Sequence, residues 1–184
     1  MGTPKIVQVC GANGAGKSYV VRKWIKGFKP SLVKPIFVPD RTLPLGYEID
    51  GCFVVGAYEE ANSGGVDSIR TGQEFCFELI EARWREGYDV LFEGALIMNH
   101  TRGLELWRQT KSLVVLELKV STQDCLNSIN ERRARVGSPE SNPKHLKAMV
   151  VRSRNYCIKL RQAGCVVLKV TRKEAVSALE KLLG

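Results

Sequence analysis

A glycine-rich stretch near the start of the chain constrains the fold more than any other feature. Residues 8–18 read QVCGANGAGKS and meet the pattern G-x-x-x-x-G-K-S in full. A β-type run from Lys5 to Cys10 precedes the stretch, and a helical pattern from Lys17 to Lys26 follows it. Glycines let such a turn curl until its backbone N–H groups converge, and the start of the helix adds the positive end of a dipole. This context predicts a loop that encloses phosphate groups.

Individual residues of this loop have separate expected tasks. Lys17 is expected to reach the β- and γ-phosphates of a nucleotide, and the Ser18 hydroxyl to hold Mg²⁺. The bound molecule is therefore expected to be a triphosphate such as ATP, with Mg²⁺. The residues expected to bind it are Gly11, Asn13, Gly14, Ala15, Gly16, Lys17, Ser18 and Tyr19.

Alternating strand and helix patterns predict the fold class. The β-type runs are Lys5 to Cys10, Pro35 to Pro39, Asp89 to Glu93, Leu113 to Val120 and Cys165 to Val170. Helical patterns lie between them, and strands connected in this way form a parallel sheet covered on both faces. We expect an α/β fold in three layers, with a five-stranded parallel sheet, and one domain over residues 1–184, a length that suits a single core.

Carboxylates follow two of the predicted strands. Glu93 ends the apolar run that starts at Asp89, and Asp40 follows the run from Pro35. If both strands are parallel to the first, both acids lie at the edge of the sheet where ligands bind. We favour Asp40 as the base that accepts a proton from the attacking hydroxyl, and Glu93, with Ser18, as the metal site; Asp67 is the alternative base.

An arginine-rich segment predicts a mobile lid over about residues 131–143. The sequence ERRARVG ends a helical pattern and is followed by a loop rich in Gly, Ser, Pro and Asn. Arg132 and Arg133 are expected to neutralise the γ-phosphate, to act in catalysis and to exclude water, with Arg133 also contacting the nucleotide. The alternative is that each arginine is a solvated surface charge.

The segment of about residues 41–72 fits the strand–helix alternation poorly and resembles an insertion that recognises the substrate. Glycines here permit close approach of a substrate, and Tyr58 is expected to stack on a base. A turn that caps the following helix explains the same residues equally well. The candidate substrate-binding residues are Arg41, Tyr58, Ser63, Gly64, Gly65, Asp67 and Arg70.

Charge is unevenly distributed along the chain, whose formal net charge is +9. Residues 1–39 carry seven Lys or Arg and no acid, residues 40–106 carry 5 basic and 13 acidic side chains, and residues 107–184 carry 16 and 6. Such a distribution favours polyanionic partners, although a basic surface also serves solubility alone. No apolar run approaches a membrane span, so we expect a cytoplasmic protein. The six cysteines form no C-x-x-C pair, and the two histidines, His100 and His145, lie far apart in sequence, which gives a zinc site little basis.

Taken together, GANGAGKS, VLFEG and ERRARVG resemble the P-loop nucleoside and nucleotide kinases. That resemblance implies the strand order 2-3-1-4-5, ATP with Mg²⁺, and a closing lid. The Gly-Gly-Val-Asp-Ser-Ile core at 64–69 is similar to an element of phage kinases that phosphorylate 5-hydroxymethyluracil in DNA. Asp40-Arg41 is placed like the catalytic Asp and Arg of polynucleotide 5′-kinases. Glu93-Gly94 replaces the Asp-Arg of thymidylate kinases, which argues against that activity.

The function expected first is therefore ATP-dependent phosphoryl transfer to a hydroxyl on DNA, at the 5-hydroxymethyl group of a modified pyrimidine. Its location would be the host cytoplasm if a phage encodes the chain. One alternative acceptor is a free nucleoside or nucleotide, or a polynucleotide 5′-hydroxyl. A module that hydrolyses a nucleotide without an acceptor is the third possibility.

Overall fold

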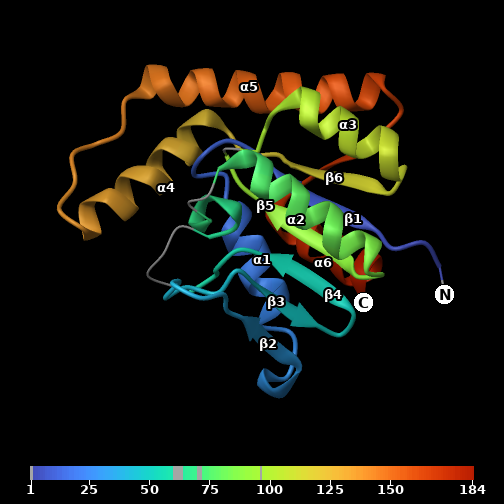
Figure 1. Cartoon of the computed structure of the whole chain (residues 1–184). Helices are drawn as coiled ribbons and strands as arrows, with labels where there is room; N and C mark the ends of the chain where they lie inside the picture. Colours follow the sequence, from blue (N-terminus) through green and yellow to red (C-terminus); the bar gives the residue numbers. More distant parts are fainter. Residues whose placement is uncertain (1, 60–63, 70–71, 96) are drawn as a thin grey trace.

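The computed structural model describes residues 2–59, 64–69, 72–95 and 97–184. Within these residues one sheet contains seven strands in the order β2-β3-β4-β5-β1-β6-β7 (Figure 1). The strands are β1 (Ile6–Cys10), β2 (Val33–Ile36), β3 (Gly46–Ile49), β4 (Cys52–Val55), β5 (Asp89–Glu93), β6 (Leu113–Leu118) and β7 (Val166–Val170). The predicted α/β fold is confirmed, but the predicted number of five strands is wrong.

The additional strands form an antiparallel hairpin at one edge of the sheet. β4, β5, β1, β6 and β7 are mutually parallel, and numbered among themselves they have the order 2-3-1-4-5. β2 and β3 pair antiparallel beside β4. Asp50 and Gly51, which join β3 to β4, both have positive φ angles, of 46° and 80°. Positive φ at both central residues is characteristic of a type I′ hairpin turn, for which Asp-Gly is a strong sequence signal.

The strand predicted from Pro35 to Pro39 was assigned to the wrong place. In the structure it is β2, which starts at Val33, ends at Ile36 and is the outermost strand of the described sheet. An outer strand tolerates Pro35 because only one side of the strand must hydrogen-bond to a neighbour. The strand that lies parallel to β5 on the side away from β1 is instead β4, whose four residues are all buried.

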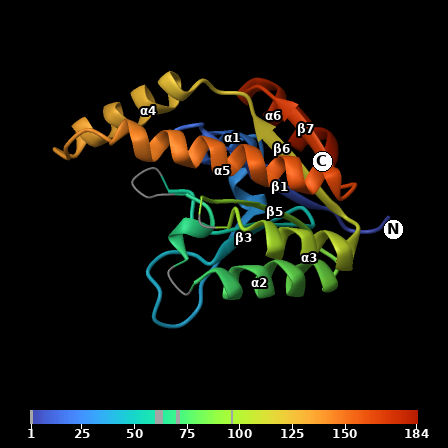
Figure 2. The ribbon, with the colours of Figure 1, turned by 90° about the horizontal axis from the view of Figure 1, so that it is seen from above.

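Helices cover both faces of the sheet, as a three-layer fold requires (Figure 2). They are α1 (Lys17–Ile25), α2 (Gln73–Arg85), α3 (His100–Thr110), α4 (Thr122–Arg135), α5 (Pro143–Gln162) and α6 (Arg172–Leu183), with short 3₁₀ turns at Pro30–Leu32 and Val66–Ser68. α2, α3 and most of α5 pack on one face; α1, α4 and α6 pack on the other. Sequence analysis missed α3, although Asn99 caps it by accepting a hydrogen bond from the Thr101 N–H. Among the described helices, none has the length and hydropathy needed to cross a bilayer.

The central position of β1 determines where the functional site lies. β1 pairs with β5 on one side and β6 on the other, and its five residues are all buried. The glycine-rich loop leaves β1 at its carboxyl end, beside the carboxyl end of β5. Ligands of open parallel sheets bind at this edge.

The first residues of α6 give a stability prediction. The Thr171 side chain accepts a hydrogen bond from the Glu174 N–H, while Glu174 Oε2 accepts one from the Thr171 N–H at 2.7 Å. Thr171→Ala should lower the free energy of unfolding by about 1 kcal/mol because it removes this helix cap. Urea denaturation measures the change. The control is Ser177→Ala, on the exposed surface of the same helix; equal losses in both variants would contradict a capping role.

Candidate active site

The glycine-rich loop adopts a conformation that only glycine accommodates readily. Gly14 and Gly16 have φ angles of 77° and 91°. A Cβ at Gly14 would lie 2.2 Å from the carbonyl oxygen of Cys125 on α4, so the loop also packs too tightly for a side chain there. Gly16 is the N-cap of α1, and no side chain caps this helix within the described structure. The first amides of α1 are thus placed to bind an anion.

Lys17 is folded back over this loop. Its side chain is 7% exposed, and Nζ donates a hydrogen bond to the carbonyl oxygen of Ala12 at 3.1 Å. A buried ammonium group is costly unless anionic groups lie near it. The loop therefore combines converging amides with a positive charge, as the sequence predicted for a phosphate site.

Ser18 and Glu93 meet at the centre of the site. Ser18 Oγ donates to Glu93 Oε1 at 2.7 Å, and Glu93 is 1% exposed. Burial raises the pKa of Glu93 to about 7, although Lys17 and the Ser18 hydrogen bond act in the opposite direction. A hydroxyl and a carboxylate oxygen at this separation form a donor set suited to a hard cation. The two residues predicted as metal ligands are thus brought together.

The segment 64–69 packs against this pair. Asp67 Oδ2 accepts a hydrogen bond from the Ala95 N–H at 3.0 Å, just beyond β5. A Cβ at Gly65 would lie 2.6 Å from Glu93 Oε1, and one at Gly64 would lie 2.9 Å from Ser18 Oγ. Gly64 and Gly65 were expected to let a substrate approach closely. In the structure they instead let the backbone pack against Ser18 and Glu93. This packing also places the Asp67 carboxylate beside Glu93, whose pKa it helps to raise.

A cavity of about 420 Å³ opens over these residues. It is lined by Asn13, Gly14, Gly16, Lys17, Ser18, Tyr19, Arg22, Gly64, Asp67, Glu93, Ser128, Arg132 and Arg172. Among the described residues, four cations and two acids face this space, and they give it a net positive lining suited to a polyphosphate. Gly11 and Ala15 do not line it; Gly11 begins the turn, and Ala15 is buried.

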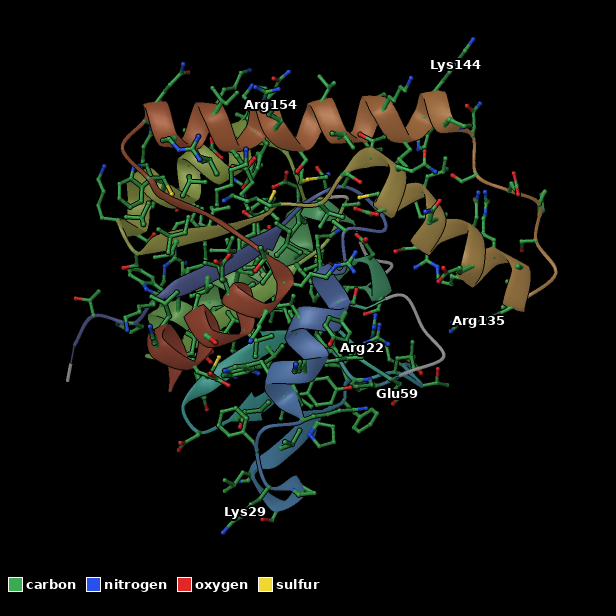
Figure 3. The ribbon with its side chains drawn as sticks, turned by 180° about the vertical axis from the view of Figure 1, so that it is seen from behind. Arg22, Lys29, Glu59, Arg135, Lys144 and Arg154 are labelled. Atoms are coloured by element: carbon green, nitrogen blue, oxygen red, sulfur yellow. The ribbon has the colours of Figure 1, made fainter. Side chains whose placement is uncertain are left out.

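Three of the described lining residues were not predicted: Arg22, Ser128 and Arg172. Arg22 lies one turn after Ser18 on α1, and its Nε donates to the Ser18 carbonyl oxygen at 3.2 Å. Figure 3 shows Arg22 on the side of α1 that faces the end of α4, where Arg135 is labelled. The helical spacing from Ser18 was the signal that could have identified Arg22.

Arg172 reaches the loop from the start of α6. Its Nε donates to the Ala15 carbonyl oxygen at 2.8 Å, and Nη2 donates to the Gly14 carbonyl oxygen at 3.3 Å. Because α6 follows β7, a parallel strand, its first residue lies at the same edge of the sheet as the loop. That position could have been inferred from the strand–helix alternation alone.

Asp40 is not at the site, contrary to the expectation for the catalytic base. It is exposed, has a φ angle of 63° and does not line the cavity. It follows β2, which lies three strand spacings from β5, a lateral distance of roughly 14 Å at about 4.8 Å per spacing. The prediction failed because it required the strand before Asp40 to be next to β5, and β3 and β4 occupy the space between them.

Some of the predicted substrate-binding residues lie at the site, some lie outside the described residues, and two, Arg41 and Tyr58, make contacts within the fold. Gly64, Gly65 and Asp67 lie at the site, whereas Ser63 and Arg70 lie outside the described residues. The Arg41 guanidinium donates to the carbonyl oxygens of Leu43 and Ser68, at 3.4 and 3.3 Å, and so joins the start of the insertion to its segment 64–69.

Tyr58 does not provide the exposed ring that was expected to stack on a base. The residue is 6% exposed and lies close to Tyr47, with ring centroids 6.4 Å apart. Burial raises the pKa of the Tyr58 hydroxyl well above its usual value. The stacking prediction is wrong for this conformation because the ring belongs to the core.

The predicted lid is the end of α4, the connection 136–142 and the start of α5. These residues are mostly exposed, and Figure 2 shows α4 and α5 projecting together beyond the sheet. Arg132 lines the cavity, whereas Arg133 does not. Closure of this segment stays a prediction.

Comparisons with known proteins agree on one family. A model of the family described as 5-hmdU DNA kinase matches residues 2–154. The 5-hmdU DNA kinase of Pseudomonas phage PaMx11 is 32% identical over 191 residues, covering 100% of this chain and 99% of the relative. The 5-hmdU DNA kinase 1 of Salmonella phage ViI is 28% identical and covers 74% of this chain and 63% of the relative.

The solved structures add a likeness in fold. A gluconokinase from Sinorhizobium meliloti 1021 superposes with a TM-score of 0.51 at 15% identity, over 100% of this chain and 95% of that one. At this identity the likeness concerns the fold alone. The family match over most of the chain and the full-length relative lead to one conclusion: the chain belongs to the 5-hmdU DNA kinase family.

Proposed function

We propose that this protein transfers the γ-phosphoryl group of ATP to the 5-hydroxymethyl oxygen of 5-hydroxymethyluracil within DNA. The observation that carries the proposal is the convergence of Lys17, Ser18, Glu93 and Asp67 around one cavity at the carboxyl edge of the sheet. Family membership supports a DNA base as the acceptor. The positive cavity supports a polyphosphate donor.

The donor half of the site consists of the loop amides and the cations. In our proposal the amides at the start of α1 and Lys17 hold the β- and γ-phosphates, while Arg132 and Arg172 neutralise charge from the other side of the cavity. Ser18 Oγ and Glu93 would hold Mg²⁺, which neutralises charge on the phosphate oxygens when bound. Positioning and charge neutralisation supply most of the catalysis in phosphoryl transfer.

At the acceptor half, Asp67 is the proposed general base. It would accept the hydroxymethyl proton as the new O–P bond forms and the bond from the γ-phosphorus to the leaving ADP oxygen breaks. The hydrogen bond from the Ala95 N–H fixes the Asp67 carboxylate at the cavity wall. From the sequence, Asp67 was the alternative to Asp40 as the general base. Asp67 lines the cavity, whereas Asp40 follows the outermost strand and does not, so we favour Asp67.

Asp67→Asn should reduce kcat by at least ~100-fold while leaving ATP binding within about threefold, because the amide cannot accept the proton. The matched control is Asp40→Asn, which removes an equal charge from an exposed position outside the cavity. Steady-state kinetics and ATP titration measure both quantities. A large loss of kcat in the Asp40 variant alone would restore the sequence-based assignment.

Glu93 gives a pH dependence of stability in the nucleotide-free protein. Its pKa is raised from 4.5 to about 7 on folding, so between these values the folded state binds more protons than the unfolded state. The free energy of unfolding should therefore fall as pH rises from 4.5 to 7 and then level off. Glu93→Gln should remove this component of the fall. Urea denaturation at pH 5 and pH 7.5 compares the variants; parallel pH profiles would show that Glu93 ionises normally.

The acceptor is identified by supplying γ-labelled ATP with one of three acceptors. These are DNA that contains 5-hydroxymethyluracil, the same DNA with thymine, and free 5-hydroxymethyldeoxyuridine. We expect label on the modified DNA alone, on the base rather than at the 5′ end. Label on the nucleoside only, or on 5′ ends, would overturn the proposed acceptor. Release of inorganic phosphate with no labelled acceptor would indicate a hydrolase.

A further inference from the structure

A second hollow lies between α3 and α5, outside the cavity over the glycine-rich loop of residues 11–18 (the P-loop). Its volume is about 720 Å³, larger than the 420 Å³ of the cavity. It is lined by Met98, Asn99, His100, Ala148, Val151, Arg152, Asn155, Tyr156 and Lys159. Figures 1 and 2 show α5 running beside α3 along its length. We call this hollow the α3–α5 groove.

The groove has a positively charged rim. The 20 residues of α5 include six Lys or Arg and no Asp or Glu, and none of the described residues that line the groove is acidic. Arg152 and Lys159 face the groove and are exposed. Arg161 is partly neutralised by Glu117, 3.3 Å away, and does not line the groove. Figure 3 labels Lys144 and Arg154 on the same helix, but neither lines the groove; Arg154 lines a separate hollow that also contains Glu117. An excess of cations without acids favours a polyanion.

Beside Arg152, part of the groove wall is apolar. Val151, 56% exposed, stands on α5 between Ala148 and Arg152, and Met98 forms part of the opposite side. A free phosphate ion would leave this apolar surface in water. A nucleic acid strand matches both parts, since its phosphates pair with cations while its sugars and base edges cover apolar atoms.

The groove is also adjacent to the proposed base. Ala95, whose N–H binds Asp67, and Met98, which lines the groove, are three positions apart in the sequence, at most roughly 11 Å of extended chain. Arg152 Nε donates to the Met98 carbonyl oxygen at 3.4 Å, which ties α5 to this same segment. A strand bound in the groove would therefore lead toward Asp67.

We propose that the α3–α5 groove binds the sugar–phosphate backbone of the DNA beside the modified nucleotide. Arg152 and Lys159 contact phosphates, and Val151 contacts the sugar edge. This inference rests on the proposed function, because it takes the acceptor to be part of a strand. It adds a binding surface for the strand that is separate from the site of phosphoryl transfer.

The test compares two charge reversals on α5, Lys159→Glu in the groove and Lys147→Glu outside it. Both lysines are exposed on the same helix, so the change in net charge and in helix sequence is matched. Binding of a labelled oligonucleotide that contains 5-hydroxymethyluracil is followed by fluorescence anisotropy without ATP. At ~0.1 M salt, loss of one phosphate contact should weaken binding by about tenfold for Lys159→Glu, and by less than about threefold for Lys147→Glu.

A second variant measures the number of phosphate contacts. In the double variant Arg152→Gln/Lys159→Gln, the slope of log K against log salt should become shallower by about 2, one unit for each contact. The KM for ATP should stay unchanged in all variants, because neither residue lines the P-loop cavity. Circular dichroism confirms that each variant is folded; if Lys159→Glu is not, the glutamine variant supplies the result.

Equal weakening by Lys147→Glu and Lys159→Glu would show a general charge effect and overturn the proposal, as would no weakening by either. Light scattering supplies a further outcome: a wild-type dimer that Lys159→Glu dissociates would make the groove an interface between copies of the chain, and the proposal wrong. The proposed function is tested separately by the wild-type protein. If that protein labels modified DNA while groove variants bind normally, only the groove assignment fails.

Discussion

The site is organised around a carboxylate that is buried at the end of a central strand. Glu93 is 1% exposed at the wall of the cavity, and its hydrogen bond to Ser18 joins β5 to the first turn of α1. An ionised carboxylate in such a position requires compensating charge, which Lys17 supplies in part. The glycines at 64 and 65 then allow a third segment to pack against the same pair. The loop, the strand end and the segment 64–69 are therefore parts of one packed unit.

The sequence pattern predicted two parts of this unit, the glycine-rich loop (P-loop) and the position of Glu93. The P-loop conformation follows from its glycines and from the strand and helix around it. Glu93 was placed correctly because a continuous apolar run is typical of a strand buried on both faces, and its carboxyl end is then fixed. The five parallel strands and their order were likewise within reach of the strand–helix alternation and the family resemblance.

What failed was the assignment of neighbours in the sheet. A short β-type run such as Pro35 to Pro39 does not reveal which strand it pairs with, so this stretch was placed beside β5. The Asp50-Gly51 turn was the local signal for a hairpin, and recognising it would have moved Asp40 to the outside of the sheet. The prediction for Tyr58 failed for a related reason, because sequence alone does not distinguish an aromatic ring buried in the core from one exposed in a binding site.

Arg172 shows how a site can depend on the end of a chain that contributes no motif to it. Its guanidinium holds two carbonyl oxygens of the P-loop, although α6 begins about 160 residues after that loop and lies beyond the segment 2–154 that the family model matches. Selection on nucleotide binding would thus act on α6, a helix that carries no nucleotide-binding sequence motif. A comparison of relatives confined to the matched segment would leave out one wall of the phosphate pocket.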